Sequence, residues 1–301
     1  MAATTVGTAP APAAKQELRH KKVWSWSQPW VYLVALVTCA VAIGPVLWVV
    51  LGGARTNPQF LTDPAGLPNP WNWSNYADIL WGQFASRFWG QVMTSAIIAV
   101  GTTALVVVLG TSVAYAIGRF PMRGTGALFA IFAAGLMFPA TIGILPTWVI
   151  LGELNLVGNP LGVIIPQVAF ALPTTVVILT PFVKAIPREI EEAAEIDGAG
   201  RVKFFFRMLL PLARPGMVTV GVLAFVGSWN AFMLPLFVLG AGGAGSNRHT
   251  LPLGVQMFQT QFSSSMTSIM AFTTLAAIPA LIFFLAMQKY IVNGLSGAVK
   301  G

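Results

Sequence analysis

Six long apolar stretches limit what this chain can fold into. They cover about 30–51, 88–117, 127–150, 162–183, 216–239 and 268–291. A helix needs roughly 20 apolar residues to cross a hydrocarbon core of about 30 Å. Each stretch is continuously apolar, whereas barrel strands alternate. Charged residues make up 9% of the chain, against about a quarter in a soluble domain. The sequence therefore predicts an all-α integral membrane protein with six transmembrane helices.

The distribution of lysine and arginine predicts the orientation of these helices. If the N-terminus is cytoplasmic, fourteen of the seventeen cations fall in inside segments, and only Arg55, Arg87 and Arg248 fall outside. An excess of cations on the inner side is the usual rule for membrane proteins. We therefore expect both termini in the cytoplasm, a disordered cytosolic tail over residues 1–28, and one six-helix transmembrane domain over residues 29–301. The localisation predicted is the cell membrane, with several passes.

The net charge of +8 is accounted for by this topology and by contact with the anionic inner leaflet. It gives no reason to expect nucleic acid as a partner.

Two absences limit the functions open to the chain. No ionisable residue lies in the middle of an apolar stretch, although proton-coupled carriers place such residues there as relays. No phosphate-binding loop of the Gly-x-x-x-x-Gly-Lys-Ser/Thr type occurs either. We therefore expect no catalytic residue, no metal site and no cofactor bound by this chain. An ATP-driven pump built on this chain would therefore need a partner that hydrolyses ATP.

Acidic residues are concentrated in one segment between the fourth and fifth apolar stretches. Five of the nine acids in the chain are Glu189, Glu191, Glu192, Glu195 and Asp197. Pro187 favours a helix start, and the acids suit the positive end of the helix dipole. The glycines at 198 and 200 favour its end. The sequence predicts a short helix near 187–200, which is either a solvated face or a docking site for another protein.

The order of residues in this segment favours docking. Glu192-Ala-Ala, followed by Gly198 and then by Met208-Leu-Leu-Pro211, resembles the EAA signature of binding-protein-dependent ABC importer permeases. Met208 departs from that signature, which has isoleucine there. Further segments are similar to the carbohydrate-uptake branch of that family, and within it to the maltose-transporter-type second permease subunit: 114–120, 228–230 and 294–301.

The resemblance implies a type I ABC importer permease fold and a set of partners. It implies a second, different permease subunit, two ATPase subunits that hold ATP and Mg²⁺, and an extracytoplasmic solute-binding protein. By match to the motif, the contact with the ATPase would use Glu191, Glu192, Ala193, Ala194, Asp197, Gly198 and Ala199. The C-terminal tail, with Ser296, Gly297 and Lys300, would lie at the ATPase interface.

The resemblance also implies that the solute is a sugar, with a di- or oligosaccharide expected. Sugars are bound by aromatic faces and by amide or hydroxyl groups. Trp229 and Asn230 in the fifth stretch and Gln167 in the fourth are therefore candidates for the substrate pathway, unless they join helices to one another. Two alternatives stay open: a permease for glycerophosphodiesters or polyol derivatives, and a secondary carrier or channel that acts alone.

Overall fold

The computed structural model describes residues 29–120, 123–240, 248–258 and 265–298, with side chains as far as Gln288. This part of the chain is helical, and no strand occurs within these ranges. The first part of α1 (Pro29–Gly53), up to Val46, is a compact unit by itself, and a second unit begins at Leu47. The predicted all-α class is confirmed for the described residues.

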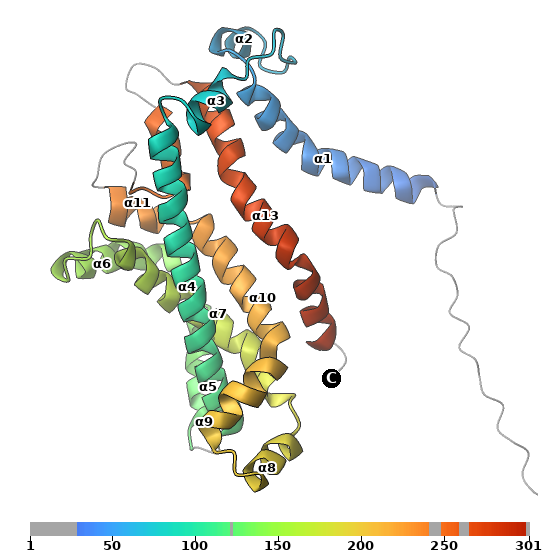
Figure 1. The fold of residues 1–301 in the computed structure, drawn as a ribbon, viewed down its shortest axis with the longest axis vertical. Helices are drawn as coiled ribbons and strands as arrows, with labels where there is room; N and C mark the ends of the chain where they lie inside the picture. The colour runs from blue at the N-terminus through green and yellow to red at the C-terminus, as the bar shows by residue number, and fades with distance from the viewer. Residues whose placement is uncertain (1–28, 121–122, 241–247, 259–264, 299–301) are drawn as a thin grey trace, which may run out of the picture. The chain divides into compact units, whose positions relative to one another are not determined.

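Four long helices organise the described part of the second unit: α4 (Ala85–Arg119), α7 (Pro160–Lys184), α10 (Leu210–Trp229) and α13 (Met266–Ala298) (Figure 1). The shorter helices are α2 (Asn57–Thr62), α3 (Ser74–Leu80), α5 (Thr125–Gly135), α6 (Ala140–Glu153), α8 (Arg188–Ile196), α9 (Arg201–Phe204), α11 (Met233–Leu239) and α12 (Leu251–Gly254). A π turn, η1 (Phe205–Leu209), joins α9 to α10, and a 3-10 turn, η3 (Val255–Phe258), follows α12.

Several helices are long and apolar enough to cross a membrane. Among the described residues there are five: α1, α4, α7, α13, and the continuous run Arg201–Trp229 through α9 and α10. The number becomes six when the bent pair of α5 and α6 is counted as one span. Four predicted stretches, those at 30–51, 88–117, 162–183 and 268–291, each fall within a single helix. The side of the membrane on which the termini lie stays a prediction.

The third stretch departs from the sequence prediction. Residues 127–150 were expected to form one helix but form two, α5 and α6, which are bent by 96° across residues 136–139. Pro139 directly precedes α6 as its N-cap residue. Proline has no N–H with which to continue the hydrogen bonds of α5, so the chain turns there.

The fifth stretch is also displaced from the predicted range 216–239. The helical run begins at Arg201, ends at Trp229, and is separated from α11 by residues 230–232. Pro211 lies in the first turn of α10, directly after the π turn. A wider turn leaves room for a residue without an N–H. Trp229 and Asn230 therefore lie at the end of α10 and not in the interior of a helix.

Close approach of α4 to α7 forms the centre of this unit. A methyl group at Gly110 of α4 would lie 2.3 Å from Cγ2 of Thr175 on α7, so only a residue without a side chain fits there. Small residues at such contacts let two membrane helices approach closely. The Thr175 hydroxyl donates to the carbonyl of Ala171 in its own helix. The α4–α7 pair is thus the centre against which α5 and α10 pack.

Candidate functional site

The acidic segment forms α8, and local sequence accounts for both of its ends. Pro187 is the N-cap residue, and Glu189 and Glu191 lie in the first turn, near the positive end of the helix dipole. At the other end Gly198 has a φ of +72°, as its position after the helix predicted. The Gly198 N–H donates to the carbonyl of Glu195 (3.0 Å), and the Ala199 N–H donates to that of Ala194 (2.8 Å). These two bonds form a Schellman motif, which favours glycine at this position.

The two faces of α8 have different surroundings. Ala194 and Ala199 are buried in the protein's own core, beside residues such as Tyr115 and Phe204. Glu192, Ala193, Glu195, Ile196 and Asp197 are exposed, and Ile196 has 87% of its surface accessible. Ala193 is therefore part of the exposed surface of α8, whereas Ala194 is not. Consecutive helical residues point about 100° apart, and the inward direction falls on Ala194.

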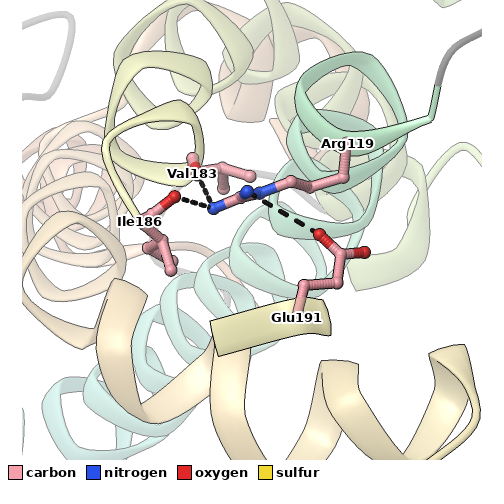
Figure 2. A network of polar contacts seen from close by, with 4 residues as sticks. All are labelled: Arg119, Val183, Ile186 and Glu191. Carbon is pink, nitrogen blue, oxygen red and sulfur yellow. Dashed lines mark hydrogen bonds and ion pairs between the residues drawn. The ribbon is translucent and has the colours of Figure 1, made fainter. Parts of the chain in front are cut away.

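A buried arginine holds the inner side of α8 (Figure 2). Arg119 is the last residue of α4, and its side chain is 3% exposed. One terminal nitrogen donates to the carbonyl of Val183 at 2.9 Å and also to that of Ile186. The other lies 3.7 Å from a carboxylate oxygen of Glu191. A cation at the negative end of α7 is favourable. Arg119 therefore links the C-terminal ends of α4 and α7 to the first turn of α8.

The sequence did not predict that Arg119 would contact the end of α7 and the start of α8. It places the residue among the inside cations and within the family-like segment 114–120. A basic residue in the last turn of a long helix is a sequence signal for binding free carbonyls. That signal does not indicate which helix supplies them.

A hollow of about 180 Å³ lies beside the Arg119–Glu191 contact. Cations and acids both line it, together with one aromatic ring: Arg119, Arg188, Arg201, Glu191, Glu192, Glu195 and Phe120. The guanidinium carbon of Arg201 lies 4.9 Å from the centre of the Phe120 ring, within the range of a cation–π contact. The surface beside the first turn of α8 is thus polar, although the long helices that α8 connects are apolar.

A second cleft, of about 300 Å³, lies among α4, α6, α7, α10 and α11. We call it the Gln167 cleft, after the residue that its polar contacts share. The Gln167 side-chain oxygen accepts hydrogen bonds from the hydroxyls of Ser228 (2.6 Å) and Thr102 (3.1 Å). The Gln167 side-chain nitrogen is buried and has no hydrogen-bond partner among the described residues. Thr141 and Phe170 also line the cleft.

The structure brings only one of the three predicted pathway residues to this cleft. Trp229 is buried on another side of α10, where its indole N–H donates to the Ala276 carbonyl of α13 at 3.3 Å. Its ring also stacks on Phe225. Asn230 is exposed, and its amide donates to the carbonyl of Val226 at 2.9 Å. Ser228 and Thr102 reach the cleft instead, and the neighbouring sequence gave no sign of their shared contact.

Some predictions concern residues that cannot be placed. Ser296 and Gly297 lie in the last turns of α13, where side chains are not described, and Lys300 lies outside the described residues. The predicted N-terminal tail, residues 1–28, also lies outside them. Within the described ranges, no group of three or more His, Cys, Asp or Glu side chains is arranged to hold a metal ion.

Comparisons with known proteins agree on one family. The family described as "binding-protein-dependent transport system inner membrane component" matches residues 106–297. The chain is 30% identical over 267 residues to the diacetylchitobiose uptake system permease protein NgcG of Streptomyces coelicolor, covering 88% of this chain and 86% of that protein. It is also 30% identical over 270 residues to the trehalose/maltose transport system permease protein MalG of Thermococcus litoralis, covering 89% and 95%.

The fold has a counterpart among solved structures. A chain from a bacterial ABC transporter involved in the import of the acidic polysaccharide alginate superposes with a TM-score of 0.72 and 21% sequence identity. The superposition covers 89% of this chain and 98% of that chain. At this level of identity the likeness concerns the fold alone, and that fold is the one of an ABC importer permease.

Proposed function

The chain belongs to the family of binding-protein-dependent transport system inner membrane components, and we propose that it is the permease subunit of an ATP-driven sugar importer. The family places it in a membrane and makes it a transport subunit, not an enzyme. The stand-alone carrier considered from the sequence has no support in this membership.

The proposed solute is a di- or oligosaccharide. The similarity to permeases named for diacetylchitobiose and for trehalose and maltose supports this class. The Gln167 cleft supports it too, because amide and hydroxyl groups beside an aromatic ring are the groups that bind sugars. A polyol derivative or glycerophosphodiester is the alternative, and the phosphate of the latter would require a cation. Among the described residues that line the cleft there is none.

The proposed assembly joins this chain to a second permease subunit, two ATPase subunits that hold ATP and Mg²⁺, and an extracytoplasmic binding protein. Alternating access would follow when ATP binding moves the ATPase subunits and α8 carries that motion into the helices. The C-terminal residues Ser296, Gly297 and Lys300 are proposed to contact the ATPase, as the resemblance to the family implies.

The single observation that carries the coupling proposal is the division of α8 into two faces. Its inner side is fixed to the bundle by buried Ala194 and by the Arg119–Glu191 contact. Its outer side exposes Glu192, Ala193 and Ile196. A helix held rigidly on one face and exposed on the other can transmit a displacement. We propose that Glu192, Ala193 and Asp197 contact the ATPase, while Ala194, Gly198 and Ala199 hold the helix in position.

Charge reversal at Glu192 tests the coupling proposal. Glu192→Lys should leave insertion in the membrane intact and abolish sugar-stimulated ATP hydrolysis and uptake, because like charges at a docking surface cost several kcal/mol. Glu153→Lys is the matched control, since Glu153 is exposed at the end of α6, far along the chain from α8. Normal uptake by the Glu192→Lys transporter would contradict the docking assignment.

A panel of radiolabelled diacetylchitobiose, trehalose and maltose tests the proposed solute. Membrane vesicles that contain the complete transporter and its binding protein should accumulate at least one of the three in an ATP-dependent manner. Accumulation of a labelled glycerophosphodiester, and of none of the sugars, would favour the alternative.

A further inference from the structure

The Gln167 cleft lies where two broken helices meet. The first residues of α6, Ala140 and Thr141, line it directly after the break between α5 and α6. Ser228, at the end of α10, and Ala231, in the break before α11, line it as well. Two interruptions of helical structure therefore border one cleft. Backbone groups freed at such breaks can be satisfied by neighbouring protein or by water or solute in a cavity.

Hydroxyl groups in this cleft behave differently from those elsewhere in the same helices. Thr103, next to Thr102 in α4, donates to the Ala99 carbonyl at 2.6 Å. Thr180 of α7 donates to the Val176 carbonyl at 2.7 Å. Such bonds to a carbonyl four residues back are how a membrane helix satisfies its own hydroxyls. Thr102 and Ser228 donate to Gln167 instead, although both are buried. Two helices thus supply donors that fix the position of one amide on a third helix.

Within the part of the chain that the structure describes, only one end of the Gln167 side-chain amide has hydrogen-bond partners. One end of Gln167 receives two hydrogen bonds, while the other end is buried without a hydrogen-bond partner among the described residues. Buried polar groups are normally bonded, and one that is not needs an explanation such as a ligand or a bound water. If the oxygen and the nitrogen of the Gln167 amide exchanged places, one of the two atoms would still have no hydrogen-bond partner among these residues. Gln167 lines the cleft of about 300 Å³, and its free nitrogen is covered until the side chain shifts toward that space.

We propose that the Gln167 cleft is a sugar-binding subsite contributed by this subunit. A shift of the Gln167 side chain brings the free end of its amide to a sugar hydroxyl, Thr141 offers a second hydroxyl contact, and the Phe170 ring covers a C–H face of the sugar. Thr102 and Ser228 hold the oxygen end of the amide. The inference rests on the proposed function, because it requires the transported solute to be a sugar. It assigns no sugar contact to Trp229, which packs against α13.

Substrate protection of an introduced cysteine tests the subsite. Cys39 is the only cysteine of the chain, so Cys39→Ser followed by Thr141→Cys gives one thiol at the cleft, at an exposed position. The rate of alkylation is measured in the complete transporter with and without diacetylchitobiose, trehalose or maltose. A sugar present at about ten times its Kd should slow the reaction by roughly tenfold, in proportion to the unoccupied fraction. Ser112→Cys, on an exposed part of α4 away from the cleft, should react equally with and without sugar.

Second-site variants then show whether the amide provides the contact. Gln167→Leu and Thr102→Val, each combined with Thr141→Cys, should raise the sugar concentration that gives half protection by roughly threefold to tenfold, the usual effect of one hydrogen bond. Thr103→Val should not, because the Thr103 hydroxyl bonds its own helix. Comparison of these two neighbouring threonines separates a change in sugar binding from a general loss of packing. A loss of packing alone would not change the sugar concentration that gives half protection.

The outcomes are distinct. A transporter that imports a sugar of the panel but shows no protection at Thr141→Cys would overturn the subsite and leave the proposed function standing. Protection with an unchanged half-effective concentration in both Gln167→Leu and Thr102→Val would also overturn it. A thiol that never reacts in the complete transporter would mean that a partner subunit fills the cleft, which contradicts the inference. A transporter that imports none of the three sugars would contradict the proposed substrate class, and the subsite with it.

Discussion

Replacing Arg119 with leucine removes the contact that joins three helices. The carbonyls of Val183 and Ile186 then lose their shared donor in a buried place. The Ile186 carbonyl is left without a donor among the described residues, which costs about 1–3 kcal/mol, whereas the Val183 carbonyl keeps the backbone N–H of Ile186 at 3.4 Å. The Glu191 contact adds less, because it is long at 3.7 Å and its carboxylate is 22% exposed. We therefore expect Arg119→Leu to destabilise the protein by about 1–4 kcal/mol.

Thermal unfolding of the purified transporter, followed by intrinsic fluorescence, measures this loss. Arg123→Leu is the matched control, because it deletes the same charge four residues later at an exposed position. Arg119→Lys should recover part of the stability, since a lysine is a single-point donor and cannot reproduce the planar fork. ATP hydrolysis should continue in the Arg119→Leu transporter with less sugar imported per ATP, because α8 is no longer tied to α4 and α7. If Arg119→Leu and Arg123→Leu unfold at the same temperature, the reasoning from the buried contact is refuted.

Further predictions concern other segments of the chain. Gly198→Val should lower coupled uptake more than Gly198→Asn, because a β-branched residue resists the φ of +72° while asparagine tolerates it; equal uptake by the two variants would contradict this. In a cysteine-free background, Ser74→Cys should react with an impermeant thiol reagent from outside intact cells and Glu195→Cys should not; both positions are exposed, and external labelling of Glu195→Cys would contradict the predicted topology. Trp229→Phe should lower stability by about 1 kcal/mol through loss of its bond to α13, with the preference among sugars unchanged. Burial lowers the pKa of His249 below its ordinary 6.5. The unfolded chain therefore takes up the proton first as the pH falls, the melting temperature should drop below pH 6.5, and His249→Leu should flatten that dependence.

Much of the fold followed from the sequence because membrane helices are specified locally. Long apolar runs require a hydrogen-bonded backbone within each segment, so their positions are visible in the chain itself. The ends of α8 were equally local: Pro187 before it, and Gly198 after it with the positive φ that a Schellman ending requires. The two errors, at residues 136–139 and 230–232, arose because continuous hydropathy contains no information about where a helix bends or stops.

The sequence by itself determined that this is an all-helical membrane chain, that an acidic helix stands between two of its spans, and that its motifs match a transport family. The tertiary structure alone decided which side of α8 faces outward, that Arg119 reaches carbonyls more than 60 residues away, and that Gln167 meets Thr102 and Ser228. Those contacts depend on how helices distant in sequence pack together. Hydrophobicity does not specify that packing, because every long helix here has apolar residues to place against its neighbours or against lipid.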